Sequence, residues 1–341
     1  MLIRSVAPLR LGLAGGGTDV SPYCDIYGGA VLNATISLHV YATIEPRNDG
    51  KIEMVSFDKN EKIITDAKPF LEIDSSLDLL KAVYNRIVKE FNDGKPLSFT
   101  LTTYSEAYAG SGLGTSSTLV VAVIGCFAEW LKLPLGEYDI ANMAFEIERI
   151  ELKHHGGKQD QYAATFGGFN FMEFYANNKV IVNPLRIKQE YIEELQHNLL
   201  LYYTGKSRFS SDIIKEQKAN VERKDEKSIE AMHKLKEQAF LMKEAILKGK
   251  IDEIGEILRF GWENKKKMAK AITNPLIDEI YDTALKAGAT GGKISGAGGG
   301  GFFMFYCPKN TKYKVMEALK KYKGEFKSYH FTKKGLQTWT I

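Results

Sequence analysis

The chain has 341 residues, 44% of them hydrophobic and 26% charged, which is enough for two packed domains with apolar cores. A net charge of +4, without a lysine cluster interleaved with aromatic residues, argues against a nucleic-acid partner. The longest apolar run, residues 119–128, is about half of what a membrane-spanning helix requires, and residues 2–7 lack a signal-peptide profile. We therefore expect a cytoplasmic protein without a membrane partner, and three isolated cysteines, Cys24, Cys126 and Cys307, agree with a reducing compartment.

In chain order, the hydrophobic pattern predicts mixed α and β structure in the first half. We expect strands at residues 2–7, 29–46, 51–57 and 97–104, a helix at residues 78–91, and helices beginning near Thr115 and Glu137. A strand pair at residues 167–174 and 179–182 and a strand at residues 199–204 follow. Helical patterns then run through residues 211–247, 251–268 and 275–287, before a final strand, helix and strand. This pattern predicts an α+β protein with two domains, residues 1–185 and 186–341, and a nucleotide between them.

Residues 110–118, GSGLGTSST, lead directly into the apolar run where a buried helix is expected to begin. Glycines let the backbone approach a ligand closely, and a helix start presents free N–H groups and the positive end of its dipole to an anion. Hydroxyl groups there can cap the helix, bond phosphate oxygens or ligate magnesium; the alternative is a capped helix after a flexible loop. The expected ATP-binding residues are Gly110, Ser111, Gly112, Leu113, Gly114, Thr115, Ser116 and Ser117.

Two further glycine clusters strengthen the phosphate interpretation. Residues 8–19, PLRLGLAGGGTD, follow the first predicted strand, and residues 293–301, KISGAGGGG, precede the apolar residues 302–306. Three such turns indicate backbone that converges on one anionic ligand. Residues 288–295, GATGGKIS, are not a P-loop, because one residue is missing before Gly-Lys and Ile294 occupies the Ser/Thr position.

In their order along the chain, these motifs resemble those of the GHMP kinases, a family that includes galactokinase, homoserine kinase and mevalonate kinase. Residues 156–161, GGKQDQ, are similar to the family segment that carries the catalytic aspartate. The resemblance spans nearly the whole chain. It implies an N-terminal domain like domain 2 of ribosomal protein S5, a ferredoxin-like C-terminal domain, an active site between them, and ATP and Mg²⁺ as cofactors.

The first motif also separates branches of this family. Galactokinases have Glu-His before the Thr-Asp pair, where this chain has Gly16 and Gly17. With residues 27–36 and 156–161, the motif resembles the branch that phosphorylates the anomeric hydroxyl of D-glycero-D-manno-heptose 7-phosphate, giving the 1,7-bisphosphate used for nucleotide-activated heptose. Two alternatives stay open: a kinase of an unphosphorylated sugar such as fucose, and a sensor that binds sugar and ATP without turnover. A homodimer is also left open.

Phosphoryl transfer needs a positioned acceptor hydroxyl, neutralised charge and an acceptor for the proton. The resemblance implies that Asp160 receives or orients this proton and that Arg10 pairs with Asp160 and touches the phosphoryl group. Ser116 and Glu148 are the expected Mg²⁺ ligands, because both offer hard oxygen atoms and Glu148 matches the family's metal-binding glutamate. Glu146, two residues away, is expected on another helix face and in solvent.

Thr18 and Asp19 resemble the family's sugar-binding pair, and Gly16 and Gly17 lie beside them. A buried carboxylate that accepts two hydroxyl groups fixes the orientation of a sugar.

A 7-phosphate requires a further basic pocket. Lys206 and Arg208, in the loop after the strand at residues 199–204, are the first candidates, and Lys153 and Lys158 are the alternatives. The neighbouring histidines at positions 154 and 155 are interpreted as loop residues, because no spaced Cys or carboxylate partner completes a zinc site.

Overall fold

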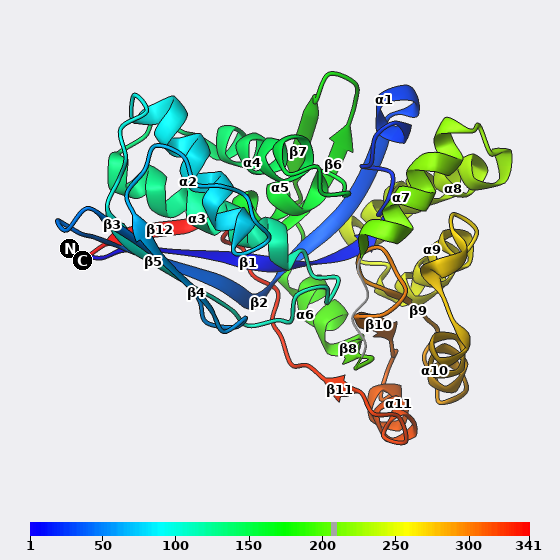
Figure 1. The fold of residues 1–341 in the computed structure, drawn as a ribbon. Coiled ribbons are helices and arrows are strands. Elements are labelled where there is room, and N and C mark those ends of the chain that lie inside the picture. Colours follow the sequence, from blue (N-terminus) through cyan, green and yellow to red (C-terminus); the bar gives the residue numbers. More distant parts are fainter. Residues whose placement is uncertain (206–209) are drawn as a thin grey trace.

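The computed structural model describes residues 1–205 and 210–341. An eight-stranded sheet spans one part of the molecule, and a four-stranded sheet lies in the other part with most of the C-terminal helices (Figure 1). The larger sheet contains β1 (Ile3–Ala14), β2 (Gly29–Pro46), β3 (Lys51–Ser56), β4 (Glu61–Asp66), β5 (Phe99–Ser105), β6 (Phe169–Phe174), β7 (Val180–Pro184) and β12 (Gln337–Thr340). The smaller sheet, in the order β11-β8-β10-β9, contains β8 (Leu199–Tyr203), β9 (Gly291–Ile294), β10 (Phe302–Tyr306) and β11 (Glu325–Phe326).

The 18-residue strand β2 organises the larger sheet. One edge of β2 pairs with β1, while the other edge pairs with β6 near its start and with β5 near its end. The remaining strands extend this sheet in the order β12-β1-β2-β5-β3-β4, and β7 pairs with β6. Because β1 runs antiparallel to β2 through the core, its last residues carry the first glycine motif to the place where the two parts of the molecule meet (Figure 1).

Four helices cover one face of the larger sheet: α2 (Asp78–Phe91), α3 (Thr115–Leu131), α4 (Glu137–Phe145) and α5 (Gln159–Phe166) (Figure 1). Helix α2 is amphipathic and buries Leu80, Val83 and Ile87 along one stripe. Helix α3 is apolar around most of its circumference and packs against both β1 and β2. Helix α4 continues into a π-helical turn, Glu146–Glu151, which leads toward α5.

The remaining helices lie mostly around the smaller sheet (Figure 1). Two of them start at side-chain caps: Asp225 Oδ2 accepts a hydrogen bond from the Ser228 backbone N–H, and Asn274 Oδ1 accepts one from that of Ile277. The helices of this second group are α1 (Tyr23–Tyr27), α6 (Gln189–Asn198), α7 (Ser210–Glu222), α8 (Glu226–Leu247), α9 (Ile254–Lys265), α10 (Pro275–Lys286) and α11 (Thr311–Leu319), with 3₁₀ turns at Ile251–Glu253 and Lys270–Ile272.

The structure differs from the expected elements in several places. Strand β1 continues to Ala14 because its pairing with β2 persists through the start of the glycine motif. The helical pattern at residues 211–247 forms two helices, since Lys224 has a left-handed φ of 57° and Asp225 caps a new helix. The sequence did not predict helices α1, α5 and α6 or strands β4 and β9.

The two chain ends lie side by side (Figure 1), where the backbones of Leu2 and Ile341 exchange two hydrogen bonds of 2.8 and 2.9 Å. Strand β12 consequently joins the sheet built by the first half of the chain. The domain boundary at residue 185 stays a prediction. Within residues 1–205 and 210–341, no helix has the length and apolar character needed to cross a bilayer.

Candidate active site

The second and third glycine motifs are packed backbone against backbone. A Cβ atom on Gly112 would lie 2.3 Å from the carbonyl oxygen of Ser295, and Gly112 has a φ of +84°. Ser295 Oγ donates to the Gly112 carbonyl at 2.8 Å, and the Phe302 N–H donates to the Ser111 carbonyl at 3.1 Å. Only glycine permits this approach, so the two loops form one continuous wall.

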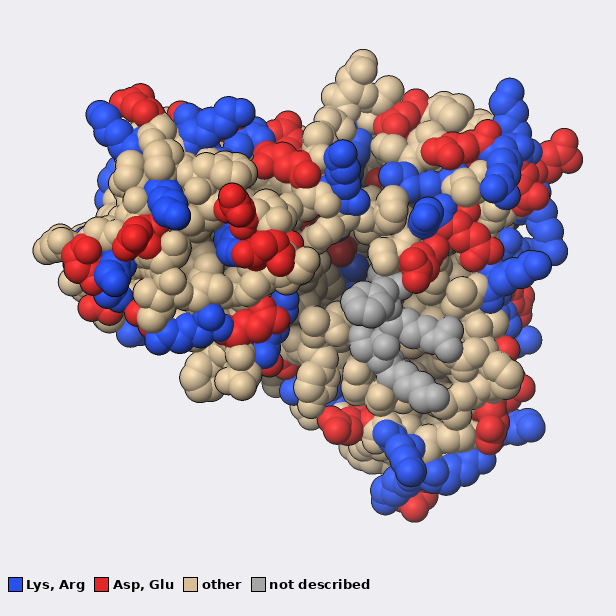
Figure 2. Space-filling model, viewed as in Figure 1, with Lys and Arg blue, Asp and Glu red and all other residues tan. Residues whose placement is uncertain are grey.

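A pocket lies against this wall, between the two parts of the molecule. Figure 2 shows it as a hollow in the middle of the viewed face, with charged side chains at its base. Its lining includes residues from β1, from the start of α3, from α5 and from α9. All three glycine motifs contribute to it, as the sequence predicts.

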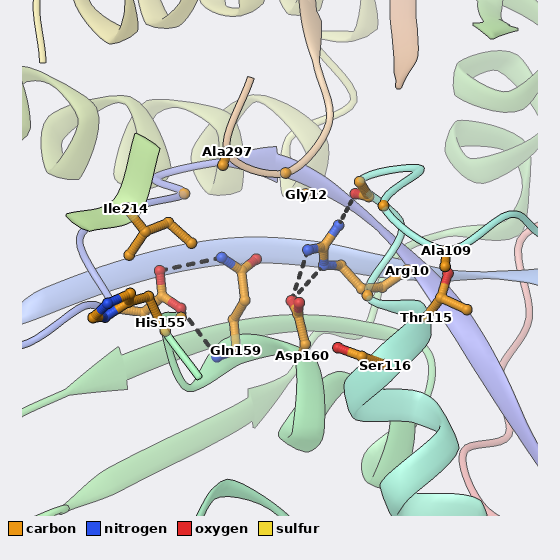
Figure 3. Close-up of a pocket in the computed structure, with 18 of the residues that line it drawn as sticks. Arg10, Gly12, Ala109, Thr115, Ser116, His155, Gln159, Asp160, Ile214 and Ala297 are labelled. Atoms are coloured by element: carbon orange, nitrogen blue, oxygen red, sulfur yellow. Dashed lines mark hydrogen bonds and ion pairs between the residues drawn. The ribbon is translucent and has the colours of Figure 1, made fainter. Parts of the chain in front are cut away.

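Arg10 and Asp160 form the central ion pair of this pocket (Figure 3). Arg10 Nε and Nη2 both lie 2.7 Å from Asp160 Oδ1, and Arg10 Nη1 donates to the Gly112 carbonyl at 2.6 Å. The Arg10 side chain is buried, whereas one-fifth of the Asp160 side chain is exposed. Asp160 Oδ2 lies on the side of Gly114, 3.4 Å from where a Cβ atom of that residue would be. The pair therefore presents a carboxylate oxygen toward Gly114 of the second glycine motif.

Two buried lysines add positive charge to the same pocket. Lys293 Nζ donates to the Gly12 carbonyl at 2.8 Å, and Lys265 Nζ donates to the Gly296 carbonyl. Burial lowers the pKa of Lys265 to about 8, with a further contribution from the Arg10 guanidinium. Burial, Lys265 and Arg10 lower the pKa of Lys293 well below its usual value.

The sequence analysis missed the role of both lysines. Lys293 stands inside the third motif, so a signal for it existed, whereas Lys265 is one of three consecutive lysines with nothing to distinguish it.

Asp19 is buried in the pocket lining next to Gly157 and is held by three donors. Its Oδ1 accepts from the Gly17 N–H and from Gln159 Nε2, and its Oδ2 accepts from the Gln159 N–H, all at 3.1 Å. A carboxylate has about four acceptor positions, so it retains capacity for one further hydroxyl. Thr18 is fully buried, and its hydroxyl is hydrogen-bonded to the backbones of Gly15 and Ala30.

Ser116 and Glu148 lie together as expected of a ligand pair. Ser116 Oγ donates to Glu148 Oε1 at 3.0 Å, and Gln161 Nε2 donates to Glu148 Oε2 at 2.6 Å. Figure 3 shows Ser116 pointing toward Asp160 from the first turn of α3. The Glu148 side chain is fully buried, with Arg149 Nη1 3.7 Å from Oε1.

Glu146 faces away from this pair. The sequence predicted that its side chain is in solvent, but two other side chains bind its carboxylate. Its Oε2 forms a 2.7 Å ion pair with Arg86 of α2, and its Oε1 accepts from Asn142.

Hard-oxygen ligands suit Mg²⁺, and Ser116 and Glu148 supply a hydroxyl and a carboxylate that already adjoin. Within the described residues, no group of three His, Cys, Asp or Glu side chains could hold a metal ion. The residues therefore fit a metal held partly by protein and partly by phosphate oxygens, as Mg²⁺ usually is when it accompanies a nucleotide.

The structure separates the predicted residues into two groups. Arg10, Gly16, Gly17, Asp19, Gly110, Gly112, Gly114, Thr115, Ser116 and Asp160 line the pocket. Thr18, Ser111, Leu113, Ser117 and Glu148 are buried behind its wall. Lys206 and Arg208 lie outside the described residues.

Comparison with known proteins agrees with this geometry. Residues 78–168 match the model of the GHMP kinases N terminal domain, and residues 242–324 match that of the GHMP kinases C terminal domain. The chain is 52% identical to the D-glycero-alpha-D-manno-heptose 7-phosphate kinase of Campylobacter jejuni, over 99% of each protein. It is 28% identical to the bifunctional fucokinase/GDP-fucose pyrophosphorylase of Arabidopsis thaliana, over 94% of this chain and 31% of that protein.

A solved structure, that of a D-glycero-D-manno-heptose 1-phosphate kinase from Bacteroides thetaiotaomicron, superimposes with a TM-score of 0.85. It is 47% identical in sequence, and the match covers 99% of both chains. The predicted two-domain fold with mixed α and β structure is thereby confirmed. This chain belongs to the GHMP kinase family.

Proposed function

We propose that this protein transfers the γ-phosphoryl group of ATP to the anomeric hydroxyl of D-glycero-D-manno-heptose 7-phosphate, giving the 1,7-bisphosphate. The observation that carries the proposal is the Arg10–Asp160 ion pair in a pocket bordered by three glycine motifs. GHMP kinases use ATP, and the 52% identical relative is a kinase of heptose 7-phosphate by name, which supports this acceptor. The product serves the synthesis of nucleotide-activated heptose.

Asp160 is the residue that we assign to the acceptor hydroxyl. Arg10 occupies Oδ1 with two contacts, so Oδ2, on the side of Gly114, can accept the hydroxyl proton as the O–P bond forms. The fixed guanidinium keeps the carboxylate oriented and lies close enough to the phosphates to neutralise charge that develops during transfer.

The nucleotide phosphates occupy the glycine wall. Backbone N–H groups at the start of α3 and the ammonium groups of Lys265 and Lys293 offset their charge. Ser116 and Glu148 would hold Mg²⁺ there, and the metal, when bound, neutralises phosphate charge and orients the γ-phosphoryl group.

Asp19 holds the sugar. Gln159 and the Gly17 backbone fix its carboxylate, so a ring hydroxyl that donates to it sets the position of the anomeric carbon relative to Asp160. Gly16 and Gly17 shape the wall beside this hydroxyl. Thr18 supports the turn through its backbone contacts.

The test is an ADP-release assay with Mg-ATP against heptose 7-phosphate, mannose, fucose, galactose and mevalonate, with phosphorus NMR of each product. We expect turnover of heptose 7-phosphate and a new anomeric phosphate signal. Turnover confined to an unphosphorylated sugar would refute heptose 7-phosphate as the acceptor, but it would not contradict the proposed mechanism of phosphoryl transfer. Binding of sugar and ATP without turnover would favour a sensor.

The three cysteines are free and buried, which supports the proposed location in the reducing cytoplasm. Homodimer formation stays a prediction.

A further inference from the structure

A second, smaller pocket adjoins the active site at its sugar end. Asp19 and Gly156 line both pockets, so a molecule held by Asp19 can extend from one into the other. Most of the polar side chains around the second pocket are cationic or imidazole groups. Its lining includes Arg149, Lys153, Lys158, Lys218, His154 and His155, and we call it the lysine pocket.

Lys158 is the buried cation of the lysine pocket. Its side chain is 2% exposed, and among the described residues its Nζ has no hydrogen-bond partner. The nearest carboxylate oxygen, Oδ1 of Asp25, is 3.9 Å away, and the Phe145 ring centroid is 5.4 Å away. A buried ammonium group is costly unless it is paired and hydrogen-bonded. The Lys158 ammonium group therefore has a distant carboxylate but lacks the hydrogen-bonded anionic acceptor that its burial favours.

The other basic groups give the lysine pocket a positive potential. Besides burial, the charges of Lys218, Lys215 and Arg149 lower the pKa of His155, against an opposing effect of Asp212. Arg149 is partly engaged, because its Nη2 donates to Ser117 Oγ. Asp19 is the acidic residue that lines the lysine pocket. Its carboxylate already accepts three hydrogen bonds, from Gln159 and Gly17.

Three consecutive residues at the start of α5 link the lysine pocket to the reaction. Asp160 contacts Arg10, Gln159 contacts Asp19, and Lys158 lines the lysine pocket. One short segment thus places a group for the acceptor hydroxyl, a group that fixes the carboxylate proposed to hold the sugar, and a buried cation without a hydrogen-bond partner among the described residues. A sugar phosphate has its functional groups in the same order, from the anomeric hydroxyl through the ring to the distal phosphate.

We propose that the lysine pocket binds the distal phosphate of the acceptor, with Lys158 as its buried cation and Lys153 and Lys218 at its rim. The proposal rests on the proposed function, since it assigns the end of the same substrate that Asp160 does not contact. It makes Lys158 a specificity-determining residue, which discriminates a phosphorylated from an unphosphorylated sugar. Phosphate oxygens accept strong, charge-assisted hydrogen bonds from such an ammonium group.

The test compares wild type with Lys158→Met, which removes the charge and keeps the side-chain length. Lys218→Gln is the second variant, because Lys218 is only half-buried and its substitution leaves the core intact. Lys179→Met is the matched control: Lys179 is exposed in the β6–β7 turn, with its Nζ over the Tyr175 ring. For each protein, kcat and KM are measured with heptose 7-phosphate, with unphosphorylated heptose and with ATP.

We expect Lys158→Met to raise KM for heptose 7-phosphate at least about tenfold and to reduce the preference for the 7-phosphate by a similar factor. Lys218→Gln reduces this preference less, and Lys179→Met retains it. If wild type uses heptose 7-phosphate but both pocket variants keep the full preference for the phosphorylated sugar, the assignment of the distal phosphate to the lysine pocket is wrong. The proposed function then still stands. If wild type uses no heptose 7-phosphate, the proposed function and this proposal both fail.

Discussion

Gly157 lies directly against the carboxylate of Asp19. A Cβ atom on Gly157 would be 1.9 Å from Asp19 Oδ2, although the backbone of Gly157 itself lies outside the left-handed region. The close approach lets the Gln159 N–H reach the same oxygen at 3.1 Å. A loop glycine thereby determines where the Asp19 carboxylate, which we propose holds the sugar, lies.

Gly157→Ala should displace Asp19 and impair the acceptor site. We expect a rise of about tenfold or more in KM for the sugar, because a misplaced orienting group weakens both binding and alignment, with little change in KM for ATP. Gly136→Ala is the control, since the nearest atom to a Cβ there, Asp139 Oδ2, is at an ordinary 3.4 Å. Equal effects on both substrates would contradict the assignment of Asp19 to the sugar.

Asp160→Asn should remove most turnover and leave folding and ATP binding near wild type. The amide keeps the shape of the side chain but cannot take the hydroxyl proton, and a general base contributes about 100-fold to 10,000-fold to the rate. Single-turnover kinetics and thermal unfolding measure the two effects separately. Asp66→Asn, at the exposed end of β4, serves as the control. A variant with near wild-type kcat would refute the role of Asp160.

Glu148→Gln should raise the Mg²⁺ concentration needed for half-maximal activity by about tenfold, because a neutral amide is a weaker ligand than a carboxylate. Glu146→Gln is a closely matched control, since Glu146 pairs with Arg86 and faces another element. Magnesium titrations at saturating ATP measure the difference. If the two variants titrate alike, the metal ligand lies elsewhere.

Lys265 should make ATP utilisation depend on pH. The folded-state pKa of Lys265 is about 8, so its positive charge is present below pH 8 and is lost as the pH rises through this value. We expect kcat/KM for ATP, which reports the free enzyme, to fall through the same range and to be flatter in Lys265→Met. Lys267→Met, with an exposed lysine that contacts Asn264, is the control.

The lowered pKa of Lys265 also predicts the direction in which the free energy of unfolding changes with pH. Between about pH 8 and pH 10.4 the unfolded chain holds the Lys265 proton more tightly than the folded chain. The free energy of unfolding of wild type, relative to that of Lys265→Met, should therefore increase as the pH rises through this range. Denaturant unfolding at several pH values tests this, and a decrease would contradict burial of the lysine.

Local sequence determined a large part of the architecture. The boundaries of α2 (Asp78–Phe91) and β2 (Gly29–Pro46) are those that periodicity predicts, because apolar spacing at 3.6 and 2.0 residues directly reflects burial on one face. The convergence of the glycine motifs on one pocket was predictable for a similar reason. Close approach and positive φ are properties of glycine itself, as at Gly112.

The limits of β1 were decided by pairing. Nothing in residues 8–14 distinguishes a strand from the beginning of a glycine turn, whereas the neighbouring β2 supplies hydrogen-bond partners as far as Ala14. The return of β12 to β1 is likewise a long-range contact, between residues more than 300 positions apart. Such contacts have no signature in a local sequence window.

The sequence by itself indicated the groups that the structure brings together around the pocket: Arg10, Asp160, Ser116 and Glu148, and the glycines of the three motifs. Only the tertiary structure decided that Lys265 lines the main pocket and that Lys158 is buried in the pocket beside it. Lys265 has no local pattern that separates it from the other basic residues of a chain with 46 lysines and arginines, and the GGKQDQ motif that contains Lys158 does not indicate its burial. The physical reason is that burial creates their role. An ammonium group becomes a strong anion ligand when folding removes its water, and folding alone determines which lysines lose it.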